Sequence, residues 1–221
     1  MKTELTEISP ARNSQEAPDP EAKNVLFYNP IFPIMTAQVN LDLPVQKMAN
    51  EFLQMATDIN NYDGGFTTYQ NKAPLDMLPG VVDLKQAIYG IANTFNKELK
   101  YEVNQEKCSI QMWVNVMRKD GWHGHHNHPN CVYSGCFYVQ GDEDASPLII
   151  ENPSNMFRMH EPKPMRAEDM GPFTSPMMAI PVKVNSLLLW PAWLTHYVPK
   201  NPSNIPRISV SFNVDYLPLG A

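Results

Sequence analysis

Hydrophobic residues recur with two different spacings along this chain, and the spacing changes near Tyr101. Before that point they recur every three or four residues, which is the period of a helix that buries one face. The spacing predicts one helix over about 42–60 and another over about 81–99. Pro44 suits the first turn of the first helix, and the glycine-containing stretch 61–65 indicates the turn that ends it.

From about residue 105 to residue 216, hydrophobic and polar residues alternate in short segments separated by turns. A period of two is typical of strands that bury one face. The clearest strands flank a histidine-rich stretch at 121–130, and another runs from Arg207 to Asp215. Two helices followed by about eight strands predict an α+β fold whose core is a double-sheet barrel.

Other segments fall outside these two patterns. Residues 1–23 are polar and rich in Glu, Pro, Ser and Asn, which predicts a flexible N-terminal arm before a single domain at 24–221. The segment 25–28 predicts a short strand. Residues 152–178 contain many prolines and methionines without clear periodicity, and such a long insertion is usually functional. We expect a lid or binding loop there, with a tolerated surface excursion as the alternative, before strands resume at Ile180.

The composition narrows the class of protein. The chain has 221 residues, 43% of them hydrophobic and 18% charged, with a net charge of −6, as in an ordinary globular domain. The negative charge argues against nucleic acid as a partner. Three cysteines without a CxxC pair favour a reducing compartment. Because no apolar run could span a membrane and no signal peptide is evident, we expect a cytoplasmic protein without a membrane partner. A homodimer stays an open alternative.

Four of the six histidines lie within six residues, between two of the predicted strands. Imidazole is the commonest metal ligand in proteins, and residues i and i+2 of an extended segment point the same way. His126 and His128 can therefore chelate one ion, although His123 and His125 have the same spacing. A third ligand must come from elsewhere, and His196 is the best candidate. Such an arrangement leaves coordination positions open for a substrate or for O2.

The last predicted strand is polar on one face and hydrophobic on the other. Arg207 and Ser209 lie side by side on the polar face, followed by Ser211 and Asn213. Inside a barrel, a guanidinium and a hydroxyl make a receptor for a carboxylate, and an arginine buried without an anion would be costly. Tyr138, on the strand after the histidines, could donate to the same carboxylate.

Four motifs carry a family resemblance. They are His126-Asn127-His128-Pro129, Ser134-Gly135-Cys136-Phe137-Tyr138-Val139, Trp190-Pro191-Ala192-Trp193-Leu194-Thr195-His196 and Arg207-Ile208-Ser209-Val210-Ser211-Phe212-Asn213. In this order, over about 105–216, they resemble a phage-rich branch of the 2-oxoglutarate–Fe(II) oxygenases that is related to the prolyl hydroxylases. The resemblance implies a double-stranded β-helix, a jelly-roll or cupin-like barrel with N-terminal helices packed on one sheet.

The same resemblance implies the chemistry. It places the iron ligands at His126, His128 and His196. It places the residues that hold the distal carboxylate of 2-oxoglutarate at Arg207, Ser209 and Tyr138. The implied protein is a dioxygenase that uses Fe(II), 2-oxoglutarate and O2 to hydroxylate an unidentified substrate, with release of succinate and CO2.

One position departs from the wider superfamily, which has Asp or Glu where this chain has His128. Either His128 is the third ligand, or an acid such as Asp120 or Glu151 completes the site. A neutral imidazole in place of a carboxylate makes the site more positive by one charge. Two other functions stay open at this stage: a cupin-like metalloenzyme that does not use 2-oxoglutarate, and a non-catalytic metal-binding protein.

Overall fold

The structure is a computed structural model that describes residues 33–56, 64–69, 75–155, 162, 170–171 and 174–216. The chain divides into two compact units, Met1–Met35 and Thr36–Ala221. The second unit contains every helix and strand of the described residues. The expected arm at 1–23 and the strand at 25–28 lie outside the described residues, so they stay predictions. Within the described part of the chain, no helix is both long enough and apolar enough to cross a membrane.

Two α-helices precede the barrel. Helix α1 spans Val45–Met55 and helix α2 spans Val81–Glu98, and the short 3-10 helices η1 and η2 span Leu75–Met77 and Gln105–Lys107. Both α-helices lie within the ranges that the hydrophobic spacing predicts, although residues 57–60 of the first range lie outside the described residues. The spacing succeeds because the buried positions of each helix form one continuous stripe.

Ten strands make up the rest of the described unit. They are β1 Ala37–Asn40, β2 Gly65–Thr67, β3 Cys108–Met117, β4 His123–His126, β5 Tyr133–Gln140, β6 Leu148–Glu151, β7 Met177–Ile180, β8 Ser186–Pro191, β9 His196–Val198 and β10 Arg207–Tyr216. A six-stranded sheet has the order β1-β8-β5-β10-β3-β2, and a four-stranded sheet has the order β4-β9-β6-β7. All paired neighbours are antiparallel.

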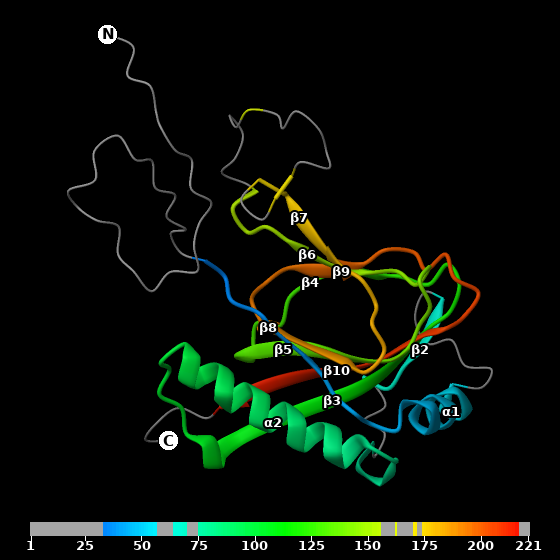
Figure 1. Ribbon diagram of the computed structural model, residues 1–221, viewed down its shortest axis with the longest axis horizontal. Coiled ribbons are helices and arrows are strands. Elements are labelled where there is room, and N and C mark those ends of the chain that lie inside the picture. Colours follow the sequence, from blue (N-terminus) through cyan, green and yellow to red (C-terminus); the bar gives the residue numbers. More distant parts are fainter. Residues whose placement is uncertain are drawn as a thin grey trace, which may run out of the picture. The chain divides into compact units, whose positions relative to one another are not determined.

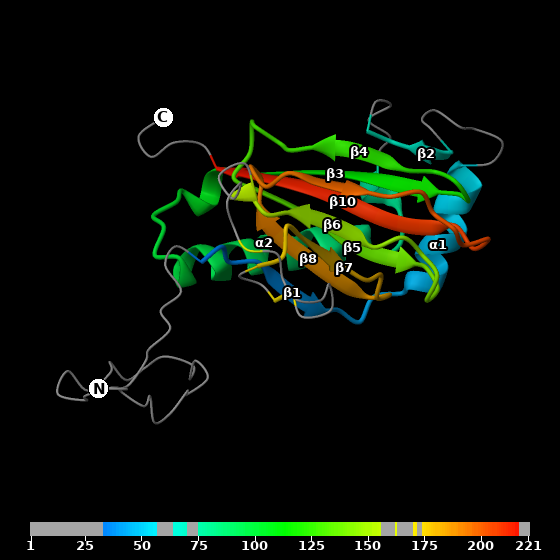
Figure 2. The same cartoon turned by 90° about the horizontal axis from the view of Figure 1, so that it is seen from above.

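The two sheets face each other, and α1 and α2 cover the outer face of the larger one (Figure 1). Figure 2, seen from above, shows the strands of the smaller sheet lying over those of the larger sheet. This arrangement confirms the expected α+β fold, a double-sheet barrel with the helices packed on one sheet.

The larger sheet separates two hydrophobic cores. Phe137 and Phe212 pack toward the helices in the outer core, which contains Phe52 of α1. Tyr138 and Trp190 belong to the inner core between the sheets. Because successive side chains of a strand point to opposite faces, the polar positions of β10 that alternate with the outer core face into the barrel.

Some strand boundaries differ from the prediction. The strand expected from Ile180 onward instead runs Met177–Ile180, because β7 pairs with β6 over these residues. Strands β1 and β2 were not predicted, since three or four residues are too few to display a period of two. Only parts of the 152–178 segment are described. The backbone N–H of Asn152 donates to the carbonyl of Pro176 at 2.9 Å, and the role of the segment as a lid stays a prediction.

The chain enters the histidine stretch through a close contact between two glycines. A Cβ atom on Gly121 would lie 2.5 Å from the carbonyl oxygen of Gly64, and a Cβ atom on Gly64, whose φ is +74°, would lie 2.4 Å from the Cα of Gly121. The carbonyl of Gly121 also accepts a hydrogen bond from the N–H of Asn201 at 2.9 Å. These contacts leave no space for a side chain and fix the path of the backbone into β4.

Candidate metal centre

Three histidines at the ends of two neighbouring strands converge. His126 ends β4, His128 follows two residues later, and His196 begins β9. Each contributes a ring nitrogen, and these nitrogens all lie within 4.8 Å of one another. His126 and His196 are paired residues of β4 and β9, with ring centroids 4.3 Å apart. The pairing of these strands thus brings together the three imidazoles that the sequence singled out, close enough for them to bind one ion.

Two of these rings are oriented by the backbone. Nδ1 of His126 lies 2.7 Å from the carbonyl oxygen of Gly124, and Nδ1 of His196 lies 2.9 Å from that of Leu194. Because a carbonyl can only accept, each Nδ1 carries the ring proton in the neutral form. Each Nε2 therefore keeps its lone pair for a metal, as in well-formed histidine sites.

Burial keeps two of the three candidate ligands neutral. Desolvation, with a further contribution from His126, lowers the pKa of His196 to about 3 and that of His128 to about 4. His196 is only 5% exposed. A metal ion must bind the unprotonated imidazole, so these two rings, which are already neutral at pH 7, need release no proton when it binds.

The other two histidines of the stretch point in opposite directions. An irregularity in the β4–β9 pairing lies between His123 and His126, and both of these residues line the same cavity. His125 is exposed, its Nδ1 lies 2.7 Å from Glu151, and its ring stacks on Tyr197 at 4.0 Å. His123 and His125 are therefore not a chelating pair.

No carboxylate joins the ligand cluster within the described residues. Glu151, one of the two acids considered from the sequence, is engaged by His125. Asp120 occupies a left-handed position, with φ of 63°, in the turn before β4. The described residues thus offer three imidazoles and no acid as candidate ligands.

A cavity of about 60 Å³ lies between the two sheets beside the histidines. This is several times the roughly 10–15 Å³ that one buried water requires. Its walls are formed by Trp113, Asn115, His123, His126, His128, Gly135, Cys136, Leu148, Trp190, His196, Val198, Arg207, Ser209 and Ser211. The candidate metal ligands and the predicted carboxylate receptor thus face one internal space.

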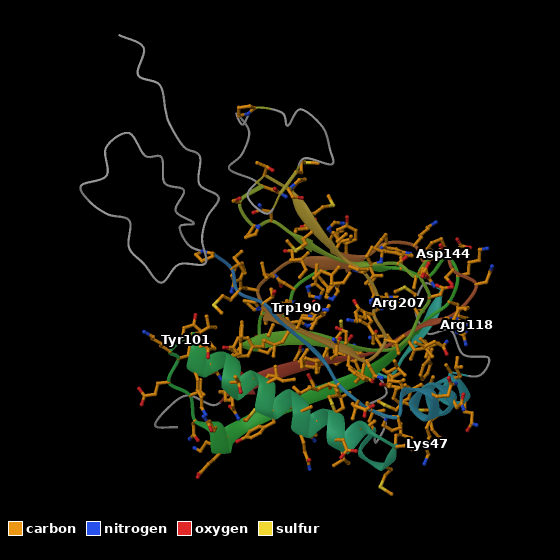
Figure 3. All side chains as sticks on the ribbon, in the orientation of Figure 1. Lys47, Tyr101, Arg118, Asp144, Trp190 and Arg207 are labelled. Atoms are coloured by element: carbon orange, nitrogen blue, oxygen red, sulfur yellow. The ribbon has the colours of Figure 1, made fainter. Side chains whose placement is uncertain are left out.

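Arg207 is buried in this cavity without an anionic partner. Its side chain is 3% exposed, Nε donates to the carbonyl of Ser146 at 3.1 Å, and Nη1 donates to Oγ of Ser209 at 3.3 Å. No carboxylate among the described residues lies within 4 Å of the guanidinium. Figure 3 shows Arg207 and Trp190 between the two sheets. Since a buried, unpaired charge is costly, the site fits an anionic ligand.

Two buried polar atoms near this site also lack partners. The hydroxyl of Tyr138 and Nε1 of Trp190 make no hydrogen bond with a described residue. Buried polar groups are normally hydrogen-bonded, so these two donors fit a polar ligand that is held inside the barrel. The ring of Tyr138 lies 4.9 Å from Cζ of Arg207, and burial raises the pKa of its hydroxyl, which therefore stays a donor.

Sequence reasoning missed several residues of the cavity wall. Asn115 occupies a polar position in the alternation of β3, and that signal could have identified it. His123 was considered only as part of an alternative chelating pair. Trp190 belongs to one of the four motifs and lines the cavity, but its unpartnered Nε1 could not be foreseen.

A second and larger cleft, of about 400 Å³, adjoins the ligand cluster on the side of His128. It is lined by Tyr69, Ser109, Gln111, Asn127, His128, Pro129, Asn130, Cys131, Asn213 and Asp215. His128 belongs to the walls of both spaces. A molecule in this outer cleft would therefore approach the metal centre past His128.

Comparison with known proteins identifies the barrel. Residues 111–213, which include all three histidines and Arg207, match the family described as "Putative 2OG-Fe(II) oxygenase". Over these residues the barrel is similar to this family. Fe(II) and 2-oxoglutarate are accordingly its metal and co-substrate, and the three imidazoles and the unpaired Arg207 fit these two groups. No curated protein matches the chain.

Solved structures share the fold of this oxygenase barrel. A prolyl-4-hydroxylase from Pseudomonas putida aligns with a TM-score of 0.54 and 9% identity, over 84% of this chain and 94% of that protein. HygX from Streptomyces hygroscopicus, solved with nickel, 2-oxoglutarate and hygromycin B, aligns with a TM-score of 0.52 and 11% identity, over 83% of each chain.

Proposed function

We propose that this protein is a non-haem dioxygenase that hydroxylates a second substrate. In the balanced reaction, R–H, 2-oxoglutarate and O2 give R–OH, succinate and CO2. The observation that carries the proposal is the shared cavity, in which three imidazoles and a buried Arg207 without an anionic partner among the described residues face one space. The similarity of the barrel to the 2OG-Fe(II) oxygenase family supports the same chemistry.

In this proposal the iron ligands are His126, His128 and His196. Bound iron supplies the activation of O2 that side chains alone cannot provide. Three neutral ligands leave the double positive charge of Fe(II) uncompensated by the protein. The site therefore attracts the dianionic co-substrate more strongly than a site with one carboxylate ligand would.

Arg207 and Ser209 would hold the distal carboxylate of 2-oxoglutarate. The guanidinium provides a charge-assisted hydrogen bond and the serine hydroxyl provides a second donor. Tyr138 would assist through its unpartnered hydroxyl. Because the histidines line the same cavity, a diacid anchored at Arg207 directs its other end toward them.

The remaining walls of the cavity would exclude water. Leu148, Trp190 and Val198 are buried and border the histidine cluster or the cavity beside it. A dry site strengthens the attraction between Arg207 and a carboxylate. The second substrate would then reach the metal from the outer cleft beside His128, which is the larger of the two spaces.

Two measurements test the proposed function. Anaerobic addition of Fe(II) and 2-oxoglutarate should produce a visible charge-transfer band, and admission of O2 should then form succinate slowly without a second substrate. Metal binding without the band or succinate would favour the cupin-like alternative. Absence of the band, of succinate and of any metal-dependent reaction would favour a non-catalytic metal-binding protein.

A further inference from the structure

Three side chains, from Asn213, Ser134 and Cys131, form a closed ring of contacts with His128. Nδ2 of Asn213 lies 3.4 Å from Nδ1 of His128, and Oδ1 of Asn213 lies 2.8 Å from Oγ of Ser134. Oγ of Ser134 lies 3.8 Å from Sγ of Cys131, which in turn lies 3.4 Å from the carbonyl oxygen of His128. The ring therefore begins and ends at His128, the candidate ligand that stands where the wider superfamily has Asp or Glu.

Only one arrangement of protons in this ring lets His128 bind a metal through Nε2, the nitrogen that does not face Asn213. If the amide nitrogen of Asn213 donates to Nδ1, the neutral imidazole carries its own proton on Nε2, which blocks a metal. The oxygen and nitrogen of an amide have nearly the same shape, so the amide can turn over in place. Its oxygen then accepts from Nδ1–H of His128.

The other three groups fit this reversed arrangement. The amide of Asn213 donates to Oγ of Ser134, the serine hydroxyl donates to Sγ of Cys131, and the thiol donates to the carbonyl of His128. Each donor has one acceptor, and Nε2 of His128 keeps a lone pair. In His126 and His196, Nδ1–H donates to a backbone carbonyl, which no substitution removes. In His128 the acceptor for Nδ1–H is the side chain of Asn213.

We propose that Asn213 is the positioning residue of the third metal ligand, and that Ser134 and Cys131 fix the orientation of its amide. Asn213 acts through His128 by holding the proton on Nδ1. The proposal deepens the proposed metal site, but its first readout requires neither metal nor turnover.

The direct test is the protonation pattern of His128 in the metal-free protein. Nitrogen-15 NMR of labelled histidine separates the two neutral tautomers. We expect the Nδ1–H form for His128 in the wild type and in Asn213→Asp, because both offer an oxygen acceptor. We expect loss of that preference in Asn213→Leu. Gln111→Leu is the matched control, since Gln111 is the cross-strand partner of Asn213 and lines the same cleft but lies outside the ring.

Metal affinity gives the second readout. Removal of such a supporting hydrogen bond typically weakens metal binding by about 10- to 100-fold. We expect this loss of Co(II) affinity, with a changed d–d absorption spectrum, in Asn213→Leu, and recovery in Asn213→Asp. An Nε2–H form of His128 in the wild type would overturn the proposal, as would wild-type Co(II) affinity in a folded Asn213→Leu protein. If Asn213→Leu does not fold, the wild-type tautomer alone decides.

A separate observation concerns the outer cleft and its charge. Four amide side chains line it, from Gln111, Asn127, Asn130 and Asn213, and each offers both a donor and an acceptor. Asp215 is the one carboxylate among the described lining residues, which include no lysine or arginine. No basic side chain of the described residues lies within 4 Å of this carboxylate. The cleft therefore favours a polar ligand with a positive charge over a phosphate or carboxylate.

We infer that the second substrate is a hydroxylated amine of the amino-sugar class, with its ammonium group on Asp215 and its hydroxyls on the amides. Tyr69, which is 55% exposed and packs edge-on to Trp113 with ring centroids 5.0 Å apart, offers an aromatic face for a sugar ring or a cation. This inference rests on the proposed function, because it takes the outer cleft as the route to the metal.

Three matched probes separate the charge classes: glucosamine, N-acetylglucosamine and glucose 6-phosphate. Binding is measured by ligand-observed NMR with the Ni(II)- and 2-oxoglutarate-loaded protein. We expect glucosamine to bind best and glucose 6-phosphate not to bind. Asp215→Asn should weaken glucosamine about tenfold and leave N-acetylglucosamine unchanged. Equal binding of all three probes, binding of none, or an unchanged glucosamine affinity in Asp215→Asn would overturn the substrate class. Succinate formation from 2-oxoglutarate without these probes would leave the proposed function intact.

Discussion

His126 and His196 face each other across the β4–β9 strand pair, with ring centroids 4.3 Å apart. The pairing of β4 with β9 thus brings two of the candidate ligands together, although they are distant in the sequence. His128, the second residue after β4, lies at the same point. The centre is therefore only as rigid as this short pairing, and each part of it can be tested separately.

Loss of one ligand should abolish tight metal binding. We expect His196→Ala to weaken Co(II) binding by more than the roughly 10- to 100-fold that loss of a supporting hydrogen bond costs, because only two imidazoles remain. Anaerobic titration followed by absorption measures the affinity. His125→Ala is the matched control, since His125 is exposed and pairs with Glu151. Equal losses in the two variants would contradict the assignment of His196.

Arg207 should control co-substrate affinity and not metal affinity. Replacement by Met removes charge-assisted hydrogen bonds and should raise the KM for 2-oxoglutarate by about 100-fold. Succinate formation at varied 2-oxoglutarate concentrations measures this change, and Co(II) titration should give the wild-type affinity. The metal-free variant should melt no lower than the wild type, because an unpaired buried charge is removed. An unchanged KM would refute the role of Arg207.

The stability of the metal-free protein should fall in mild acid. Burial lowers the pKa of His196 to about 3, and those of His128 and His123 to about 4, from 6.5. As the pH drops below 6.5 the unfolded chain takes up protons on these residues before the folded chain does, so unfolding becomes more favourable. The free energy of unfolding is therefore unaffected by protonation of these histidines above about pH 6.5, and it falls progressively as the pH drops toward 4 and below.

Urea unfolding between pH 7.5 and pH 4.5 measures this dependence. His123→Asn and His196→Asn remove one of the titrating groups each, so each should show a shallower decline than the wild type. A double variant that declines as steeply as the wild type would show that other groups cause the loss of stability.

Two glycines should respond to substitution with opposite signs. A Cβ atom on Gly135 in β5 would lie 2.1 Å from the ring of Phe212 and 2.4 Å from the carbonyl of Leu188. Gly135→Ala should therefore destabilise the fold by at least about 1–3 kcal/mol. Gly90 in α2 has no atom within 4 Å of the equivalent position, so Gly90→Ala should stabilise by about 0.5–1 kcal/mol. Urea unfolding measures both, and a stable Gly135→Ala protein would contradict the close packing of β5 against β10.

The local spacing of hydrophobic residues was enough to predict most of the helices and long strands. Helices α1 and α2 and the long strands β3, β5 and β10 follow from the spacing of buried residues, since each backbone conformation has its own period. The same alternation indicated which residues of β10 face inward. The short edge strands β1 and β2 were missed because their sheet neighbours, and not their own residues, define them.

The sequence by itself determined the two periodicities, the candidate ligands and the motifs of the family, because these depend only on residue types and their order. Only the tertiary structure decided that His126 turns inward while His125 turns outward, since this depends on an irregularity in pairing with β9. It also decided that Arg207 is buried with no anionic partner among the described residues and that Asn213 reaches His128. Such features arise from contacts between segments far apart in the chain, and a local sequence pattern does not predict them.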